Sequence, residues 1–208
     1  MPTSEARSRG MRAIGTLALL AIVLPFIASC GVNSIPTYEE QAKAAWAQVL
    51  NQYQRRTDLI PNLVATVKGA ANFESKTLEA VVQARAKVGQ MQLPPDILTN
   101  PQAMQVFEQN QAGLTSALSR LLVVSEQYPE LKANANYQTL QAQLEGTENR
   151  IAVARRDYIG AIQLYNTELK TFPGRFWRWL LYSEAKEMAQ FTIDEKAATV
   201  PAVDFNAP

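Results

Sequence analysis

Histidine is absent from the 208-residue sequence, which removes the commonest acid–base side chain and the commonest metal ligand. The nine glycines are dispersed, so the Gly-rich loops that cradle phosphates are missing as well. No serine stands in a nucleophile-elbow pattern, and no base is available for a catalytic triad. These absences favour a protein that is not an enzyme, and we predict no catalytic residues, no metal site and no cofactor.

The sequence also lacks a large net charge and has almost no cysteine. The sequence has 20 basic and 19 acidic side chains, a net charge of +1, and so no electrostatic footprint for nucleic acid. We therefore predict no nucleic-acid partner. One cysteine allows neither an internal disulfide nor a thiolate zinc site. Apolar residues, by contrast, make up 47% of the chain, which is enough for one domain with a full core.

Residues 1–29 have the pattern of an export signal. Three arginines precede an apolar run from Leu17 to Ile27, which is shorter than the roughly 20 residues that a transmembrane helix needs. The run leads into Ile-Ala-Ser-Cys30, which resembles a bacterial lipobox. That resemblance implies cleavage before Cys30 and its modification by acyl chains such as palmitate, and two or more chains anchor a protein stably. The alternatives are an uncleaved anchor and an ordinary signal peptide with a chance cysteine.

Residues 30–37 then form a lipidated tether. The seven residues after Cys30 span at most ~25 Å, so the folded domain is expected close to the bilayer. By resemblance to the sorting rule of bacterial lipoproteins, Gly31 implies the periplasmic side of the outer membrane in a Gram-negative cell. We expect a lipid-anchored protein of the bacterial cell envelope that faces outside the cytoplasm.

Four amphipathic stretches follow, in which apolar residues recur at steps of three, four or seven. The pattern predicts helices from residue 38, with Thr37 as N-cap, over 72–90, from Pro101 to 128 and over 134–172. The last is a rod of roughly 55 Å. Pro61 lies inside the first stretch. Either it kinks a single helix that runs to about residue 71, or the chain turns at Asp58 and restarts.

Short connections between long helices favour antiparallel neighbours. We predict an all-α fold, an antiparallel up-down-up-down four-helix bundle with long helices over residues 38–173. A short aromatic and basic helix over 174–188 and a flexible, extended tail over 189–208 complete the expected organisation.

Polar side chains gather on the first and fourth helical stretches. Arg56 falls in the apolar phase of the first, and Glu148 falls in a gap of the apolar stripe of the fourth. A buried arginine needs a paired acceptor, and a carboxylate suits its guanidinium. We interpret the cluster as a polar layer that fixes helix register, with a partner groove or a carboxylate site as alternatives. Its candidate residues are Arg55, Arg56, Asp58, Asn62, Glu145, Glu148, Asn149 and Arg150.

Four alternating helices return the chain to the tether end, which places the segment after Gly174 beside the bilayer. Tryptophan and tyrosine prefer the headgroup interface, and arginine suits anionic lipid. The candidate membrane-interface residues are Phe176, Trp177, Arg178 and Trp179. The alternative is that these aromatic side chains cap the end of the bundle core.

Four runs resemble the LemA family: AWAQVLNQYQRRTDLIPNLVATVKG, LEAVVQARAK, LSRLLVVSEQYPELKANANYQTLQAQLEGTENRIAVARRDY and YNTELKTFP. The resemblance covers most of the sequence after Cys30 and implies a membrane-anchored four-helix bundle that faces outside the cytoplasm. It brings no established enzymatic activity. Magnetosome-associated members and neighbours of membrane proteases imply, by analogy alone, membrane organisation or envelope maintenance.

Three functions follow from these observations. The first is a structural or interaction module that binds a protein partner or self-associates at the membrane. The second is a binding protein for a peptide or small ligand held between helices. The third is a carboxylate metal-dependent enzyme, which the sequence disfavours because the Glu-x-x-His pairs of di-metal bundles are absent.

Overall fold

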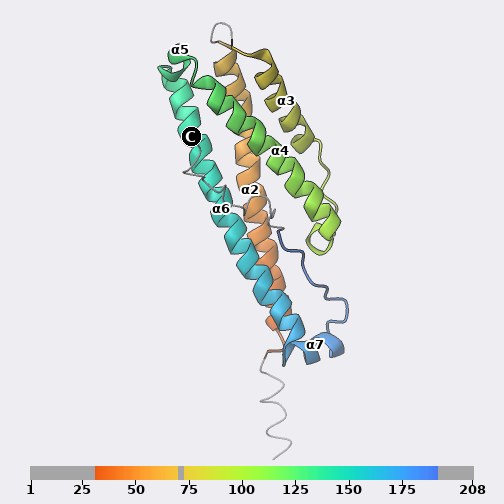
Figure 1. Ribbon diagram of the computed structural model, residues 1–208. Helices are drawn as coiled ribbons and strands as arrows, with labels where there is room; N and C mark the ends of the chain where they lie inside the picture. The colour runs from red at the N-terminus through yellow and green to blue at the C-terminus, as the bar shows by residue number, and fades with distance from the viewer. Residues whose placement is uncertain (1–30, 70–72, 192–208) are drawn as a thin grey trace, which may run out of the picture.

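The computed structural model describes residues 31–69 and 73–191, and these are all-helical, with no strand among them (Figure 1). Cys30, the predicted export signal and residues 192–208 lie outside the described residues. The elements are α2 (Ser34–Lys68), α3 (Ser75–Gly89), the 3-10 helix η1 (Ile97–Thr99), α4 (Pro101–Ser125), α5 (Pro129–Lys132), α6 (Ala135–Lys170) and α7 (Gly174–Leu180).

The helices form two pairs. The long helices α2 and α6 lie side by side in opposite directions, and α3 and α4 form a second, shorter pair against the part nearer α5 (Figure 1). The start of α2 and the end of α6 meet at α7, so the molecule has an α7 end and an α5 end. With 36 residues, α6 is a rod of about 54 Å.

The first helix begins one turn earlier than the sequence pattern predicted. It starts at Ser34 rather than after Thr37, and the Thr37 amide donates to the Asn33 carbonyl oxygen at 3.1 Å. Pro36 falls in the first turn, where a missing amide hydrogen breaks no helical bond. Ile35 is therefore part of the helix and is buried. Only residues 31–33 remain between Cys30 and the helix, a span of at most ~11 Å.

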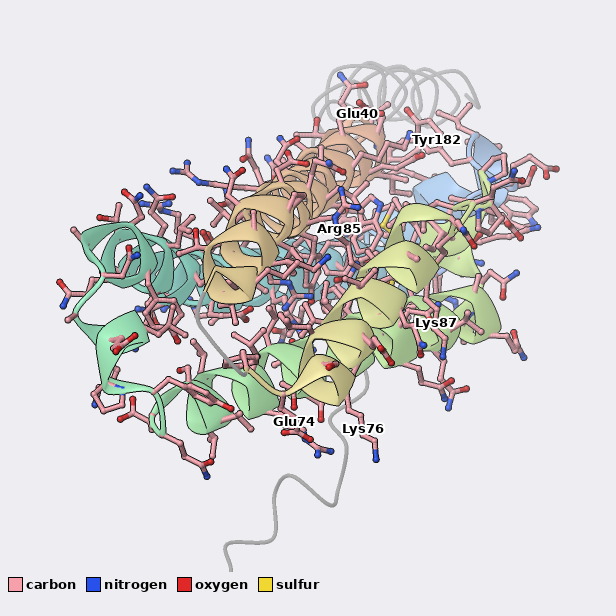
Figure 2. The ribbon with its side chains drawn as sticks, turned by 90° about the horizontal axis from the view of Figure 1, so that it is seen from above. Glu40, Glu74, Lys76, Arg85, Lys87 and Tyr182 are labelled. Carbon is pink, nitrogen blue, oxygen red and sulfur yellow. The ribbon has the colours of Figure 1, made fainter. Side chains whose placement is uncertain are left out.

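Pro61 lies inside an uninterrupted α2, so the turn and restart at Asp58 is wrong. A proline at this position leaves the carbonyl of Thr57, four residues earlier, without its helical donor. Arg85 of α3 supplies one, because its Nε donates to the Thr57 oxygen at 3.3 Å. In Figure 2 the Arg85 side chain accordingly lies between α2 and α3. Asp58 is exposed and accepts a hydrogen bond from Gln54.

The later helix starts have the caps that their sequences indicate. The Asn100 side chain accepts from the Ala103 amide at 3.1 Å, with Pro101 in the first helical position of α4. The Asn134 side chain accepts from the Asn136 and Tyr137 amides at the start of α6. Both asparagines satisfy amides that would otherwise lack a partner.

The helix predicted over 174–188 is shorter, because α7 ends at Leu180. Residues 181–191, here called the strap, then run back along the α2–α6 pair (Figure 1). Asn166 fixes the strap through two 2.9 Å hydrogen bonds to the Met188 backbone, and Tyr158 Oη donates to the Ala189 carbonyl oxygen. Residues 189–191 of the tail that was expected to be flexible are thus packed onto the helices.

Two apolar clusters make up the core. The α7-end cluster gathers Trp46, Tyr53, Phe107 and Tyr158 with Phe191 of the strap, in edge-on and tilted ring contacts. The α5-end cluster is mainly aliphatic, built on Ile60, Leu63, Leu114, Leu121 and Leu144, and it also contains the buried Tyr137. Both clusters use α2, α4 and α6, so these three helices pass from one cluster to the other.

Candidate functional site

Arg56 lies between the two apolar clusters, with 1% of its surface exposed. Its Nη1 donates to Glu148 Oε1 at 2.9 Å and to Thr115 Oγ1 at 2.7 Å. Its Nη2 donates to Gln111 Oε1 at 2.6 Å. The guanidinium thereby links α2 to α4 and α6 at one level of the fold. The three helices are thus joined by charge-assisted bonds, and the role of this layer in fixing their register stays a prediction.

The pairing of Arg56 with Glu148 is asymmetric in exposure. Arg56 is buried, whereas 41% of the Glu148 side chain is exposed, so water hydrates the carboxylate from one side. Arg56 Nε has no acceptor among the described residues. The Arg56 guanidinium also stacks 5.0 Å from the Tyr53 ring centroid, which contributes a cation–π attraction.

A second arginine extends this polar layer toward the α7 end. Arg155 lies 3.9 Å from Glu108 and stacks 4.4 Å from the centroid of the Phe191 ring. Burial raises the pKa of the Tyr53 phenol, and the positive charges of Arg155 and Arg56 oppose that rise. The strap therefore ends against the same arginine that borders the buried layer.

The other predicted members of the cluster do not enter the layer. Arg56 and Glu148 are brought into contact, and the remaining six side chains are exposed on the outer faces of α2 and α6. Those six are Arg55, Asp58, Asn62, Glu145, Asn149 and Arg150. They stay candidates for an interaction surface, separate from the buried pair.

Two residues of the layer were not predicted as partners of Arg56. Gln111 is 4% exposed on α4, and Thr115 follows one turn later. A buried glutamine in the apolar phase of a helix is the signal that could have identified the first acceptor. Thr115 gives no such signal, because a helical threonine can satisfy its hydroxyl on the carbonyl oxygen one turn earlier, as Thr115 does on Gln111.

The aromatic segment at the α7 end is divided between core and surface. Trp177 is buried at 8% exposure in the α7-end cluster, whereas Trp179 is 75% exposed and Phe176 is 45% exposed. Arg178 is half-buried. Gly31 packs against this helix: its φ of +88° favours glycine, and a β-carbon there would lie 3.1 Å from Pro173 Cγ. The described chain thus starts in contact with α7.

Within residues 31–69 and 73–191, no group of three or more histidine, cysteine, aspartate or glutamate side chains could hold a metal ion. None of the helices in this part of the chain is long and apolar enough to cross a membrane. The interior between the helices is occupied by the two clusters and the polar layer. Hollows occur at the surface, such as one of about 610 Å³ lined by Lys68, Leu78 and Glu79 among others.

Comparison with known proteins gives three informative relatives. Magnetosome protein MamQ 2 of Paramagnetospirillum magneticum is 32% identical over 91 residues, which is 44% of this chain and 32% of the relative. Magnetosome protein MamQ of Magnetospirillum gryphiswaldense is 24% identical over 209 residues, 93% of this chain and 75% of the relative. Protein LemA of Metamycoplasma hominis is 23% identical over 140 residues, 67% of this chain and 60% of the relative.

The aligned part of this chain spans about a third of the length of the first of these relatives. The match to a family model is longer: the LemA family model matches residues 45–205, from just before Trp46 of α2 to beyond the strap. Because this match covers well over half of the 208 residues, the chain belongs to the LemA family.

Proposed function

We propose that this protein is a lipid-anchored antiparallel helical bundle of the bacterial cell envelope, which acts as a structural or interaction module outside the cytoplasm. One observation carries the proposal. The only cysteine in the sequence, Cys30, ends a lipobox-like segment and directly precedes Gly31, which packs on the helical fold. A lipid at this position would hold the whole fold against the membrane through three residues of chain.

The interaction role is supported by the faces that the helices leave exposed. The outer surfaces of α2 and α6 carry the six polar candidates around Arg55 and Arg150, at the level of the Arg56 layer. Arg56 of α2 is bonded to Glu148 of α6, and a layer that fixes the register of these two helices would hold those side chains in fixed relative positions. A rigid polar face suits a protein partner or a second copy of the chain.

The two alternative functions have less support. A ligand between helices would need an internal cavity, and the space around Arg56 is filled by Gln111, Thr115 and the two clusters. A carboxylate metal enzyme would need a ligand set, and the described residues offer none. Two of the relatives are magnetosome proteins, so membrane organisation is the first process in which to examine a role for this protein.

Replacement of Cys30 tests the anchor. In cells that express Cys30→Ser, we expect no incorporation of labelled palmitate, and either release of the domain from the membrane fraction or accumulation of uncleaved precursor. Wild-type protein and the conservative Ser29→Ala variant serve as controls, since both keep the thiol. Labelling that persists in Cys30→Ser would contradict lipidation at this residue.

A crosslinking experiment tests the interaction role. Pull-down of the full-length protein from crosslinked, detergent-solubilised membranes is expected to recover a defined partner or crosslinked multimers of the chain itself. Charge reversal of Arg55 and Arg150 should reduce that recovery without changing the melting temperature, because both side chains are exposed. Recovery of the monomer alone would contradict the proposal.

A further inference from the structure

Exposed apolar side chains are concentrated at the α7 end. Of twelve large apolar side chains that are exposed in the described residues, five fall between Phe172 and Leu181, with Phe172 itself 80% exposed. Of the other seven, six are scattered singly along the helices, and Leu93 lies in the loop between α3 and η1. Isolated exposed apolar side chains are ordinary, whereas a cluster of this kind marks a surface that something else covers. The five are Phe172, Phe176, Trp179, Leu180 and Leu181.

A basic hollow borders this apolar cluster. It has a volume of about 470 Å³, and Lys170, Arg175 and Arg178 line it together with Trp179 and Ser183. None of the residues that line the hollow is acidic, although Glu168 and Glu184 flank this stretch of the sequence. Lys170 pairs with Glu187 at 2.7 Å, but neither Arg175 nor Arg178 has an ion-pair partner in the part of the chain that the structure describes. The hollow therefore offers two guanidinium groups to an anion, and guanidinium suits phosphate.

The position of Gly31, the first residue that the structure describes, indicates what covers this surface. Gly31 contacts Pro173 and lies near the Trp177 indole, and α2 starts at Ser34 beside α7 (Figure 1). Because Cys30 directly precedes Gly31, an acyl chain on Cys30 would enter the bilayer at the same end of the fold as the apolar cluster. Tryptophan, leucine and phenylalanine on a basic helix are the composition that settles at the boundary between headgroups and acyl chains.

We propose that the α7 end is a second membrane contact: Phe172, Trp179, Leu180 and Leu181 enter the headgroup–acyl boundary, and the hollow lined by Lys170, Arg175 and Arg178 binds the phosphate of an anionic lipid. Trp177 takes no part, because it is buried in the core. The inference rests on the proposed anchor at Cys30, which sets which end faces the bilayer. Two contacts would orient the long α2–α6 pair relative to the membrane, which a single flexible anchor does not.

Fluorescence of the full-length protein in vesicles tests this contact. The three tryptophans are Trp46 and Trp177, which are buried, and Trp179, which is exposed, so the difference between wild type and Trp179→Phe isolates Trp179. We expect lipids with brominated acyl chains to quench Trp179, and quenching about twofold greater when phosphatidylglycerol is added to phosphatidylcholine. In Arg175→Glu/Arg178→Glu the added quenching should vanish, whereas the matched charge reversal Lys76→Glu/Lys87→Glu, at two exposed positions of α3, should keep it.

Flotation of the same vesicles separates the possible failures. If wild-type protein floats with the vesicles but Trp179 is not quenched, the contact at α7 is wrong and the anchor stands. If the protein does not float, the anchor fails and the contact fails with it. Quenching that is equal in both lipid compositions would overturn the phosphate role of the hollow. Protection of Trp179 from both brominated lipid and aqueous acrylamide would show that a protein copy covers it, which also overturns the proposal.

Discussion

Arg56 is stabilised in the interior by neighbours that offer hydrogen-bond acceptors, because a guanidinium can only donate. Its bonds to Gln111, Thr115 and Glu148 come from α4 and α6, so each bond depends on the relative position of whole helices. The exposure of Glu148 lowers the desolvation cost of the pair on one side. The layer is thus a buried cation with a carboxylate that still reaches water.

Replacement of Arg56 by alanine should destabilise the protein by about 2–4 kcal/mol. The substitution leaves Gln111 Oε1 buried without its donor and opens a cavity between the clusters, and both effects reduce the free energy of unfolding. Urea denaturation followed by circular dichroism measures the change. The neighbouring Arg55→Ala is the matched control, and we expect it to lie within about 0.5 kcal/mol of wild type because Arg55 is exposed. An unchanged midpoint for Arg56→Ala would show that the layer adds no stability.

The burial of Arg56 could be predicted, since it falls in the apolar phase of α2, whereas its partners could be predicted only in part. Glu148 lies in a gap of the apolar stripe of α6, and its carboxylate has the charge that pairs with an arginine. Gln111 and Thr115 carry no charge, and their selection depends on the rotation of α4 about its axis. That rotation is set by packing against the other helices, which a single helical period does not encode.

At the scale of the elements, α2 continues through Pro61 because another helix satisfies the freed carbonyl. Arg85 of α3 donates to the Thr57 carbonyl oxygen, and the same hydrogen bond links α3 to α2. The unbroken apolar phase of the sequence across Pro61 indicated the continuous helix. The start of α2 was misplaced because the tether was predicted to run to Thr37, although a proline such as Pro36 is compatible with the first turn of a helix.

A double-mutant cycle between Pro61 and Arg85 measures this compensation. Arg85→Met keeps the aliphatic packing but removes the donor, and it should cost about 1 kcal/mol in an otherwise wild-type protein. In a Pro61→Ala background the amide of residue 61 donates to the Thr57 carbonyl oxygen. The same change should then reduce the free energy of unfolding by only a few tenths of a kcal/mol, which corresponds to a coupling energy of about 0.5–1 kcal/mol. Lys87→Met, at an exposed position of α3, is the control, and its effect on the free energy of unfolding should be near zero in both backgrounds. Equal costs of Arg85→Met in the two backgrounds would refute the compensation.

The strap is the element that sequence patterns missed. Residues 181–191 have neither a helical nor a strand period, so the segment was interpreted as the end of a helix followed by a loose tail. Its order comes from single side chains: Phe191 fills the space between Trp46 and Tyr158, and Asn166 binds the Met188 backbone. Such contacts join residues far apart in the sequence, and periodicity cannot report them.

Phe191→Ala should therefore destabilise the whole fold by about 2–4 kcal/mol, even though Phe191 lies near the end of the described chain. The ring is 6% exposed and stacks on Arg155, so its removal leaves a cavity in the α7-end cluster and frees the guanidinium. Gln190→Ala, at the exposed neighbouring position, is the control, and we expect its free energy of unfolding to lie within about 0.5 kcal/mol of wild type. If Phe191→Ala leaves the urea midpoint unchanged, the strap does not contribute to global stability.

At the scale of the whole molecule, two apolar clusters are separated by a polar layer, and α2, α4 and α6 cross that layer without a break. A fold with two cores can unfold in two steps when the connections between them are loose. Here the connections are continuous helices, and the bonds of Arg56 couple them laterally. We therefore expect the two clusters to unfold together as one cooperative unit.

Leu121→Ala tests this cooperativity from one end to the other. Leu121 is fully buried in the α5-end cluster, and its truncation should cost about 3 kcal/mol. The tryptophans lie at the opposite end, with Trp46 and Trp177 buried in the α7-end cluster, so their fluorescence reports that cluster. If the clusters are coupled, the urea midpoint measured by fluorescence should fall with that measured by circular dichroism, by about 1–1.5 M. In Arg56→Ala/Leu121→Ala, where the lateral link is removed, the two probes should begin to separate. A fluorescence midpoint that stays at the wild-type value in Leu121→Ala alone would mean that the α7-end cluster, with its strap and proposed membrane contact, is an independent unit.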